Sequence, residues 1–190
     1  MRARLVSNAE RVLSLARSRP PTLGTGRLVC VDGPAGSGKT TLAAEIASLS
    51  GGAAVVHMDD LYEGWGGLAR VHEQVQTLLR PLADGFSGSY RRWDWPGHAW
   101  AETVLVPPAP MVLLEGVGSG SGAHSDLITV LAWVEVPFEL RMSRGLERDG
   151  DAVGEHWRQW AEDEQELFAR ERTRERADLV LDGRIGSIRG

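Results

Sequence analysis

Hydrophobic and polar residues follow two alternating patterns along this chain. Short runs that are apolar at almost every position predict strands buried on both faces, as in a parallel sheet. Five such runs occur, at residues 27–32, 53–58, 111–116, 128–136 and 177–183.

Between these runs lie segments whose apolar residues recur every three or four positions, which predicts amphipathic helices. The first, residues 4–17, is followed by Pro20 and Pro21, so that residues 1–21 form a leading helical segment. One face of it carries Leu5, Ala9, Val12, Leu13 and Ala16. The other predicted helices span residues 40–49, 69–79, 138–148 and 153–176. Strands that alternate with helices predict an α/β fold of three layers around a mainly parallel, five-stranded sheet.

Three segments fit neither pattern. Residues 84–100 are rich in glycine, tryptophan and arginine and predict a loop, and residues 102–106 predict a short extra strand. Residues 117–126 contain several glycines and serines and predict a turn or a flexible loop.

Length and composition indicate a single domain over residues 1–190, since 42% of the residues are hydrophobic and can form a proper core. The formal net charge of −5 argues against nucleic acid as a partner. No apolar run approaches the roughly twenty residues that span a membrane. The N-terminus lacks a signal-peptide core, and Cys30 is the one cysteine. We therefore expect a cytoplasmic protein without a membrane or nucleic-acid partner.

A glycine-rich segment directly follows the first apolar run. It reads Gly33-Pro34-Ala35-Gly36-Ser37-Gly38-Lys39-Thr40-Thr41. This is the phosphate-loop pattern Gly-x-x-x-x-Gly-Lys-[Ser/Thr], placed between a strand and a helix as the motif requires. The backbone N–H groups of the loop and the N-terminus of the helix are expected to bind the phosphates of ATP. The sequence thus predicts a P-loop NTPase fold that binds ATP through residues 33–41.

Lys39 is the only lysine among 21 lysines and arginines. An ammonium is a compact point charge, whereas a guanidinium is a planar fork. This difference favours a role for Lys39 between the β and γ phosphates, where a planar group would not fit.

A magnesium ion is expected beside the bound phosphates. The Thr40 hydroxyl is one predicted ligand, and a carboxylate at the end of a neighbouring strand is the other. Glu115 follows four apolar residues at the end of the third run and is the predicted magnesium carboxylate. Asp32, directly before the loop, has two open interpretations, a role toward the metal or a role in orienting the loop backbone.

Two aspartates, Asp59 and Asp60, follow the second apolar run. A kinase needs a carboxylate at this place to orient the attacking hydroxyl and to take its proton. The structural alternative is a turn or a helix cap, and it is stronger for Asp60 than for Asp59.

These motifs resemble the uridine kinase and phosphoribulokinase branch of the P-loop kinases. In that family the second strand leads into Asp-x-Phe-Tyr, which corresponds to Asp59-Asp60-Leu61-Tyr62 here. Its magnesium glutamate lies in a strand ending in Glu-Gly, which corresponds to Glu115-Gly116. The resemblance implies that Asp59 is the catalytic base and that Tyr62 lies in the acceptor cleft.

The resemblance also assigns residues 84–110 as an acceptor-side insertion. A family motif whose aspartate holds the ribose hydroxyls is matched by Trp93-Asp94-Trp95-Pro96, which implies that Trp93 and Asp94 bind the acceptor. Uridine kinases carry a base-recognition hairpin between this motif and the magnesium strand. Here that stretch is short, and the aromatic base-recognition residues have no clear counterpart.

Residues 138–176 resemble the lid and C-terminal helices of the same family. The lid arginines correspond to Arg141, Arg144 and Arg148. The resemblance implies that Arg144 and Arg148 act in catalysis by closing over the phosphates, and Arg141 is grouped with the acceptor-binding residues. Taken alone, arginines at this spacing beside acidic residues are also typical of a solvated, salt-bridged helix face.

Two aromatic sets have different expected roles. Trp93, Trp95 and Trp100 either stack on a flat acceptor or form a hydrophobic wall of the cleft. Trp157 and Trp160 lie three residues apart on a predicted helix and are expected to pack against the body of the protein. The five histidines show no pair at metal-ligand spacing, so no zinc site is expected.

The sequence therefore predicts a kinase that uses ATP and Mg²⁺ and phosphorylates a hydroxyl of a nucleoside-like or sugar-like small molecule. Two alternatives remain open. One is a regulatory ATPase or switch whose γ phosphate goes to water. The other is a nucleoside monophosphate kinase, which would need arginines around an acceptor phosphate. The arginines available for that role are Arg70, Arg80, Arg91 and Arg92.

Overall fold

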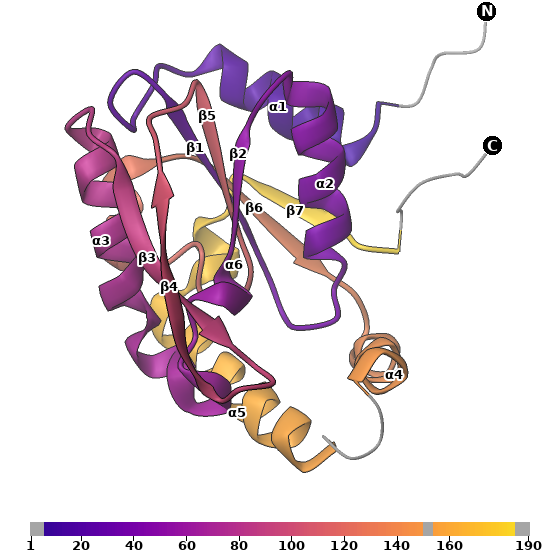
Figure 1. Cartoon of the computed structure of the whole chain (residues 1–190). Coiled ribbons are helices and arrows are strands. Elements are labelled where there is room, and N and C mark those ends of the chain that lie inside the picture. The colour runs from indigo at the N-terminus through magenta and orange to yellow at the C-terminus, as the bar shows by residue number, and fades with distance from the viewer. Residues whose placement is uncertain (1–5, 150–153, 185–190) are drawn as a thin grey trace, which may run out of the picture.

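The computed structural model describes residues 6–149 and 154–184. All five apolar runs form strands of one parallel sheet in the order β2-β5-β1-β6-β7 (Figure 1). The strands are β1 (Arg27–Asp32), β2 (Ala54–His57), β5 (Met111–Glu115), β6 (Ile128–Glu135) and β7 (Leu179–Asp182). Because β1 pairs with β5 and β5 pairs with β2, the carboxyl ends of these three strands lie side by side.

Helices cover both faces of the sheet, which confirms the predicted three layers (Figure 1). Side chains alternate along β1, so that Val29 and Val31 belong to one core and Leu28 and Cys30 to the other. The first core is closed by α1 (Asn8–Ser18) and α2 (Lys39–Ser50). The second is closed by α3 (Val71–Ala83) and α5 (Gly154–Glu171). This double burial explains why the strands are apolar throughout.

The N-terminal helix begins later than its hydrophobic pattern predicts. The Ser7 side chain accepts a hydrogen bond from the Glu10 backbone N–H, and the Glu10 carboxylate accepts one from the Ser7 N–H. This reciprocal capping fixes the start of α1 at Asn8.

The predicted loop over residues 84–100 is wrong. The chain forms an antiparallel hairpin of β3 (Gly88–Asp94) and β4 (Ala99–Val106), and β4 includes the extra strand that was expected at 102–106. A register shift between Arg91 and Trp93 interrupts the alternation of buried and exposed residues along β3. Such a bulge breaks the period of two by which a strand is recognised.

Two predicted helices are divided in the structure. Residues 69–79 fall on a 3-10 helix, η2 (Gly64–Arg70), and on α3. Residues 153–176 contain α5 and α6 (Thr173–Arg176), which are separated by Arg172 in a left-handed conformation with φ of 50°. The helix predicted at 138–148 is α4 (Phe138–Asp149).

The segment expected as a turn or flexible loop is a turn at 116–121 followed by η3 (Gly122–Leu127). None of the helices that the structure describes is both long and apolar enough to cross a membrane.

Candidate active site

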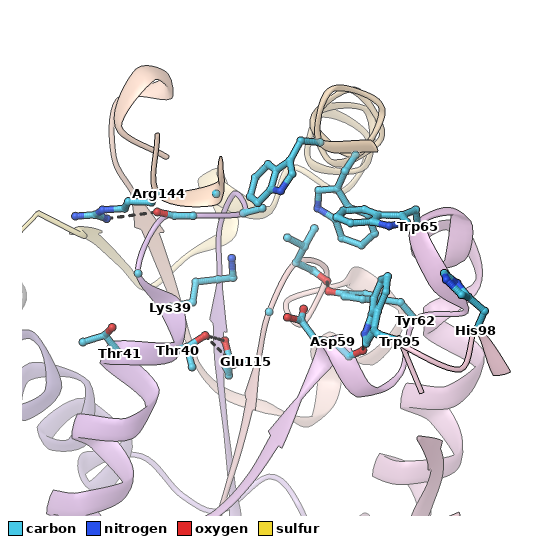
Figure 2. A pocket seen from close by; sticks show the side chains of 18 residues that line it. Lys39, Thr40, Thr41, Asp59, Tyr62, Trp65, Trp95, His98, Glu115 and Arg144 are labelled. Carbon is cyan, nitrogen blue, oxygen red and sulfur yellow. Dashed lines mark hydrogen bonds between the residues drawn. The ribbon is translucent and has the colours of Figure 1, made fainter. Parts of the chain in front are cut away.

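A pocket of about 740 Å³ lies at the carboxyl ends of β1, β2 and β5 (Figure 2). Ligand sites of open α/β sheets lie at this edge, because the loops that follow parallel strands converge there. Each of the three strands leads into a predicted site residue, Lys39 after β1, Asp59 after β2 and Glu115 at the end of β5. The pocket therefore brings together residues that are far apart in the sequence.

The phosphate loop forms one end of the pocket. Its turn depends on positive φ angles at Gly33 (139°), Gly36 (77°) and Gly38 (97°), which side chains other than glycine rarely adopt. A Cβ atom on Gly36 would also lie 2.5 Å from the Arg141 carbonyl oxygen. The Lys39 side chain is 7% exposed, and its Nζ donates to the Pro34 carbonyl at 2.9 Å. The loop thus holds its single ammonium where phosphates would bind.

Thr40 and Glu115 meet beside the loop, as the magnesium prediction requires. The Thr40 hydroxyl donates to the two Glu115 carboxylate oxygens at 3.2 and 3.4 Å (Figure 2). A hydroxyl and a carboxylate are hard oxygen donors of the kind Mg²⁺ prefers, with phosphates and waters completing its shell. In the described part of the chain no group of three or more His, Cys, Asp or Glu could hold a metal by itself. With phosphates and waters as the remaining ligands, Thr40 and Glu115 fit a magnesium ion.

His57 is a neighbour of Glu115 that the sequence patterns missed. Its Nδ1 lies 2.6 Å from the Glu115 Oε1, and this contact raises the pKa of His57. The parallel pairing of His57 with Glu115 across β2 and β5 places the two side chains together. This pair could be found only from the register between β2 and β5, which the sequence does not give.

Asp59 and Asp60 separate into two environments in the short helix η1 (Met58–Asp60). Asp59 lines the pocket, whereas Asp60 is half-buried and hydrogen-bonded to Tyr90 of β3. Burial raises the pKa of Asp60, and burial also raises the pKa of Tyr90 to about 12. Of the two aspartates, Asp59 is the one positioned for chemistry in the pocket.

Asp32 orients the backbone of the phosphate loop and of the turn after β5. This is one of the two roles that the sequence left open for it. It is fully buried and accepts hydrogen bonds from the N–H groups of Gly33 (2.7 Å), Gly118 (3.0 Å) and Gly120 (2.8 Å). Burial raises the pKa of Asp32 to about 6, although these hydrogen bonds oppose the shift. Asp32 therefore ties the turn after β5 to the start of the phosphate loop.

The predicted lid residues contact the phosphate loop in different ways. Arg144 lines the pocket, and its Nη1 lies 3.4 Å from the Gly36 carbonyl oxygen. Arg141 is placed differently from the expected acceptor role, because it forms a buried ion pair with Glu164 of α5. Glu164 also accepts from the Ala35 N–H at 2.8 Å. The Arg148 side chain lies outside the described residues.

The end of the pocket away from the phosphate loop, which we call the acceptor end after the expectation from the sequence, is aromatic. Trp65 of η2, Trp95 of the hairpin turn and Trp160 of α5 line it together, and Trp65 and Trp95 are labelled in Figure 2. We call these three residues the tryptophan wall. Trp157 and Trp160 are 1% and 4% exposed, so they pack against the body as expected and also face the pocket. Trp65 was not singled out from the sequence, because its role depends on packing against α5.

Two expected acceptor residues do not line the pocket. Trp93 of β3 is buried and packs edge-to-face on its cross-strand partner Trp100, with ring centroids 5.1 Å apart. Asp94 ends β3 and pairs with Ala99. Instead, the hairpin turn contributes Trp95 and His98 to the lining. Tyr62 lines the pocket as expected, and its hydroxyl donates to the Val117 carbonyl at 2.7 Å.

The arginines considered for an acceptor phosphate have other contacts. Arg70 pairs with Glu63, Arg80 with Asp126 and Arg92 with Glu102. Arg91 lies over the Trp100 ring at 5.6 Å. These four arginines are not part of the pocket lining.

The sheet order and the Gly-x-x-x-x-Gly-Lys-Thr loop after the central strand define the class as the α/β fold of P-loop kinases. No protein-family model matches the chain. The chain is similar to the uridine kinases of Borrelia duttonii (strain Ly) and Borrelia recurrentis (strain A1). Each is 23% identical over 138 residues, which cover 65% of this chain and 67% of the relative.

Two solved structures have the same fold. One is described as a possible uridine kinase from Bacillus stearothermophilus, with a TM-score of 0.65, 22% identity, and coverage of 91% of this chain and 98% of that chain. The other is a proposed fructose transport system kinase from Silicibacter sp. TM1040, with a TM-score of 0.63, 24% identity, and coverage of 92% and 99%. The predicted fold and the resemblance to uridine kinase-like P-loop kinases are confirmed.

Proposed function

We propose that the protein is a kinase that transfers the γ phosphate of ATP to a hydroxyl group of a nucleoside-like or sugar-like small molecule. The observation that carries this proposal is the position of Asp59. It lines the same pocket as Lys39, Thr40 and Glu115 but comes from a different strand end. A pocket that joins a phosphate loop to a separate carboxylate suits transfer to a second substrate.

In this proposal the phosphate end of the pocket holds ATP. The backbone of residues 33–41 and the N-terminus of α2 bind the phosphates, and Lys39 lies between the β and γ groups. The side chains that would hold Mg²⁺ are Thr40 and Glu115. Bound there, the ion would neutralise charge on the phosphates.

Asp59 acts on the acceptor in this proposal. Its carboxylate accepts a hydrogen bond from the attacking hydroxyl and takes the proton during transfer. The hydroxyl oxygen forms a bond to the γ phosphorus, while the bond from that phosphorus to the β–γ bridging oxygen breaks. ADP and a phosphorylated alcohol are the products.

The lid contributes positive charge in this proposal. Arg144 already lies at the phosphate end of the pocket and would neutralise charge that develops on the transferred group. Arg148 is proposed to assist it from the same helix. Arg141 has a positioning role instead, because it pairs with Glu164, which holds the Ala35 N–H of the loop.

The test measures ADP production with ATP and Mg²⁺ against a panel of nucleosides, nucleoside monophosphates, sugars and simple alcohols. We expect strong stimulation by at least one acceptor. In Asp59→Asn, kcat should fall by about two orders of magnitude or more with ATP binding retained, since a positioned general base contributes about 10²–10⁴-fold.

Asp60→Asn is the matched control, because Asp60 is the neighbouring aspartate and does not line the pocket. It should retain kcat within a few fold. Near-normal turnover in Asp59→Asn would remove Asp59 from its role. ADP production that no acceptor changes would favour the regulatory ATPase.

A further inference from the structure

The acceptor end of the pocket has a continuous aromatic lining. Trp65 lies at its centre, with ring centroids 5.4 Å from Trp95 and 5.9 Å from Trp160, and with interplanar angles of 69° and 80°. Tyr62 meets Trp160 edge-to-face at 4.9 Å. On another side, the His156 ring stacks on Trp65 at 5.4 Å and 9°. The rings of the tryptophan wall are therefore held at steep angles to one another by three separate segments, η2, the hairpin turn and α5.

Positive charge in the described pocket lining lies at the phosphate end. Lys39 contacts the Pro34 carbonyl and Arg144 contacts the Gly36 carbonyl, both within the loop. Away from the phosphate loop and Glu115, the ionisable side chains of the described lining are Asp59, Tyr62 and His98, and the His156 ring lies against Trp65. A phosphorylated acceptor would place a second phosphate near the Asp59 carboxylate without an arginine beside it. The charge distribution thus favours an uncharged acceptor.

The wall also offers few hydrogen-bond acceptors. An indole ring has an N–H donor and no acceptor. Two hydrogen-bond donors near the wall are also already used. The Trp95 Nε1 donates to the Asp59 carbonyl at 3.0 Å, and the Tyr62 hydroxyl donates to the Val117 carbonyl. A nucleobase edge or a sugar with many hydroxyl groups needs such partners, whereas a flat apolar ring is held by stacking and burial alone.

We propose that the acceptor is an uncharged alcohol whose bulk is a flat, apolar ring system, stacked on the tryptophan wall with its hydroxyl at Asp59. This inference rests on the proposed transfer to a hydroxyl group, and it replaces the nucleoside-like or sugar-like acceptor by an aromatic alcohol. His98, in the hairpin turn with a strained φ of 49°, borders the same end of the pocket and would limit the size of the ring.

The test uses calorimetric titration of the full chain with saturating Mg²⁺ and a non-hydrolysable ATP analogue. The probe is 2-(2-naphthyl)ethanol, compared with uridine, ribose, uridine monophosphate and choline. We expect the naphthyl alcohol to bind at least tenfold more tightly than each of the others. Tighter binding of any of the four, or no measurable binding of the naphthyl alcohol, would overturn the proposal.

A pair of variants locates the ring. Trp65→Leu should weaken binding of the naphthyl alcohol about tenfold or more, because stacking on an aromatic side chain contributes about 1–3 kcal/mol. Its affinity for the ATP analogue should change less than twofold. Trp100→Leu is the matched control, since Trp100 lies outside the pocket on β4, and should leave both affinities unchanged. Unchanged binding of the naphthyl alcohol in Trp65→Leu would overturn the proposed location.

Failure of this inference and failure of the proposed function give different results. If naphthyl alcohol binding depends on Trp65 but no alcohol in the panel is phosphorylated, the ring site stands and the kinase assignment fails. If uridine or ribose is phosphorylated and binds more tightly than the naphthyl alcohol, the kinase assignment stands and the ring proposal fails.

Discussion

The Lys39 ammonium and the Asp59 carboxylate lie in one pocket but reach it from different strands, β1 and β2. At the scale of single residues, the proposed function depends on the shape of the Lys39 ammonium and on the positions of the carboxylates around the phosphate loop. The tight turn of the phosphate loop leaves no room for a side chain at Gly36. The buried carboxylates of Asp32 and Glu164 accept hydrogen bonds from backbone N–H groups of the loop. Two substitutions test these statements.

Lys39→Arg keeps the positive charge and changes its shape. Because the Lys39 side chain is 7% exposed and curls against the Pro34 carbonyl, a planar guanidinium should not reach the same place. We expect kcat to fall by about two orders of magnitude, as is usual when one stabilising donor of a transition state is lost. Steady-state kinetics measure the effect, and Arg11→Lys on the exposed face of α1 is the control. Wild-type kcat in Lys39→Arg would refute the shape argument.

Asp32→Ala removes the acceptor of three backbone N–H groups, those of Gly33, Gly118 and Gly120. The free energy of unfolding should fall by at least about 2 kcal/mol, since each buried N–H group left without an acceptor costs about 1–3 kcal/mol. Urea titration measures this change. Asp126→Ala breaks an exposed ion pair with Arg80 and should cost no more than about 1 kcal/mol. Equal effects of the two substitutions would argue against the role of Asp32.

At the scale of elements, α4 and α5 both contact the phosphate loop and both contribute residues to the pocket. Arg144 and the Arg141–Glu164 pair contact the phosphate loop, while Trp157 and Trp160 of α5 line the pocket. The two helices meet where Gly145 of α4 faces the Trp157 ring. A Cβ atom at Gly145 would lie 2.4 Å from that ring. α4 and α5 therefore pack closely against each other beside the pocket.

Gly145→Ala should destabilise the protein, although the same change in an exposed helix stabilises it by about 1 kcal/mol. Overpacking against Trp157 should cost about 1–3 kcal/mol and, because Trp157 lines the pocket, should also raise KM. Thermal unfolding and steady-state kinetics measure the two effects. Gly66→Ala is the control, since its Cβ atom would meet nothing within 4 Å. A stabilised Gly145→Ala would contradict the packing argument.

At the scale of the whole molecule, the five strands of the parallel sheet could be predicted from the sequence, because burial on both faces of the sheet makes them apolar at almost every position. The β3–β4 hairpin was missed because its bulge interrupts the alternation and because tryptophans and arginines fill both strands. Residues of the phosphate loop, Asp59 and Glu115 line one pocket, since local motifs and strand ends determine their positions. Trp65 and the His57–Glu115 contact depend on long-range packing and sheet register, which no local pattern encodes.

The central claim is that the γ phosphate is transferred to an organic hydroxyl. The most direct measurement follows the label of [γ-³²P]ATP with Mg²⁺ and the best acceptor of the panel, in the wild type and in Asp59→Asn. The account predicts labelled phosphorylated acceptor in equal amounts with ADP, and its loss in Asp59→Asn. Label released as inorganic phosphate at the same rate with and without the acceptor would contradict the account.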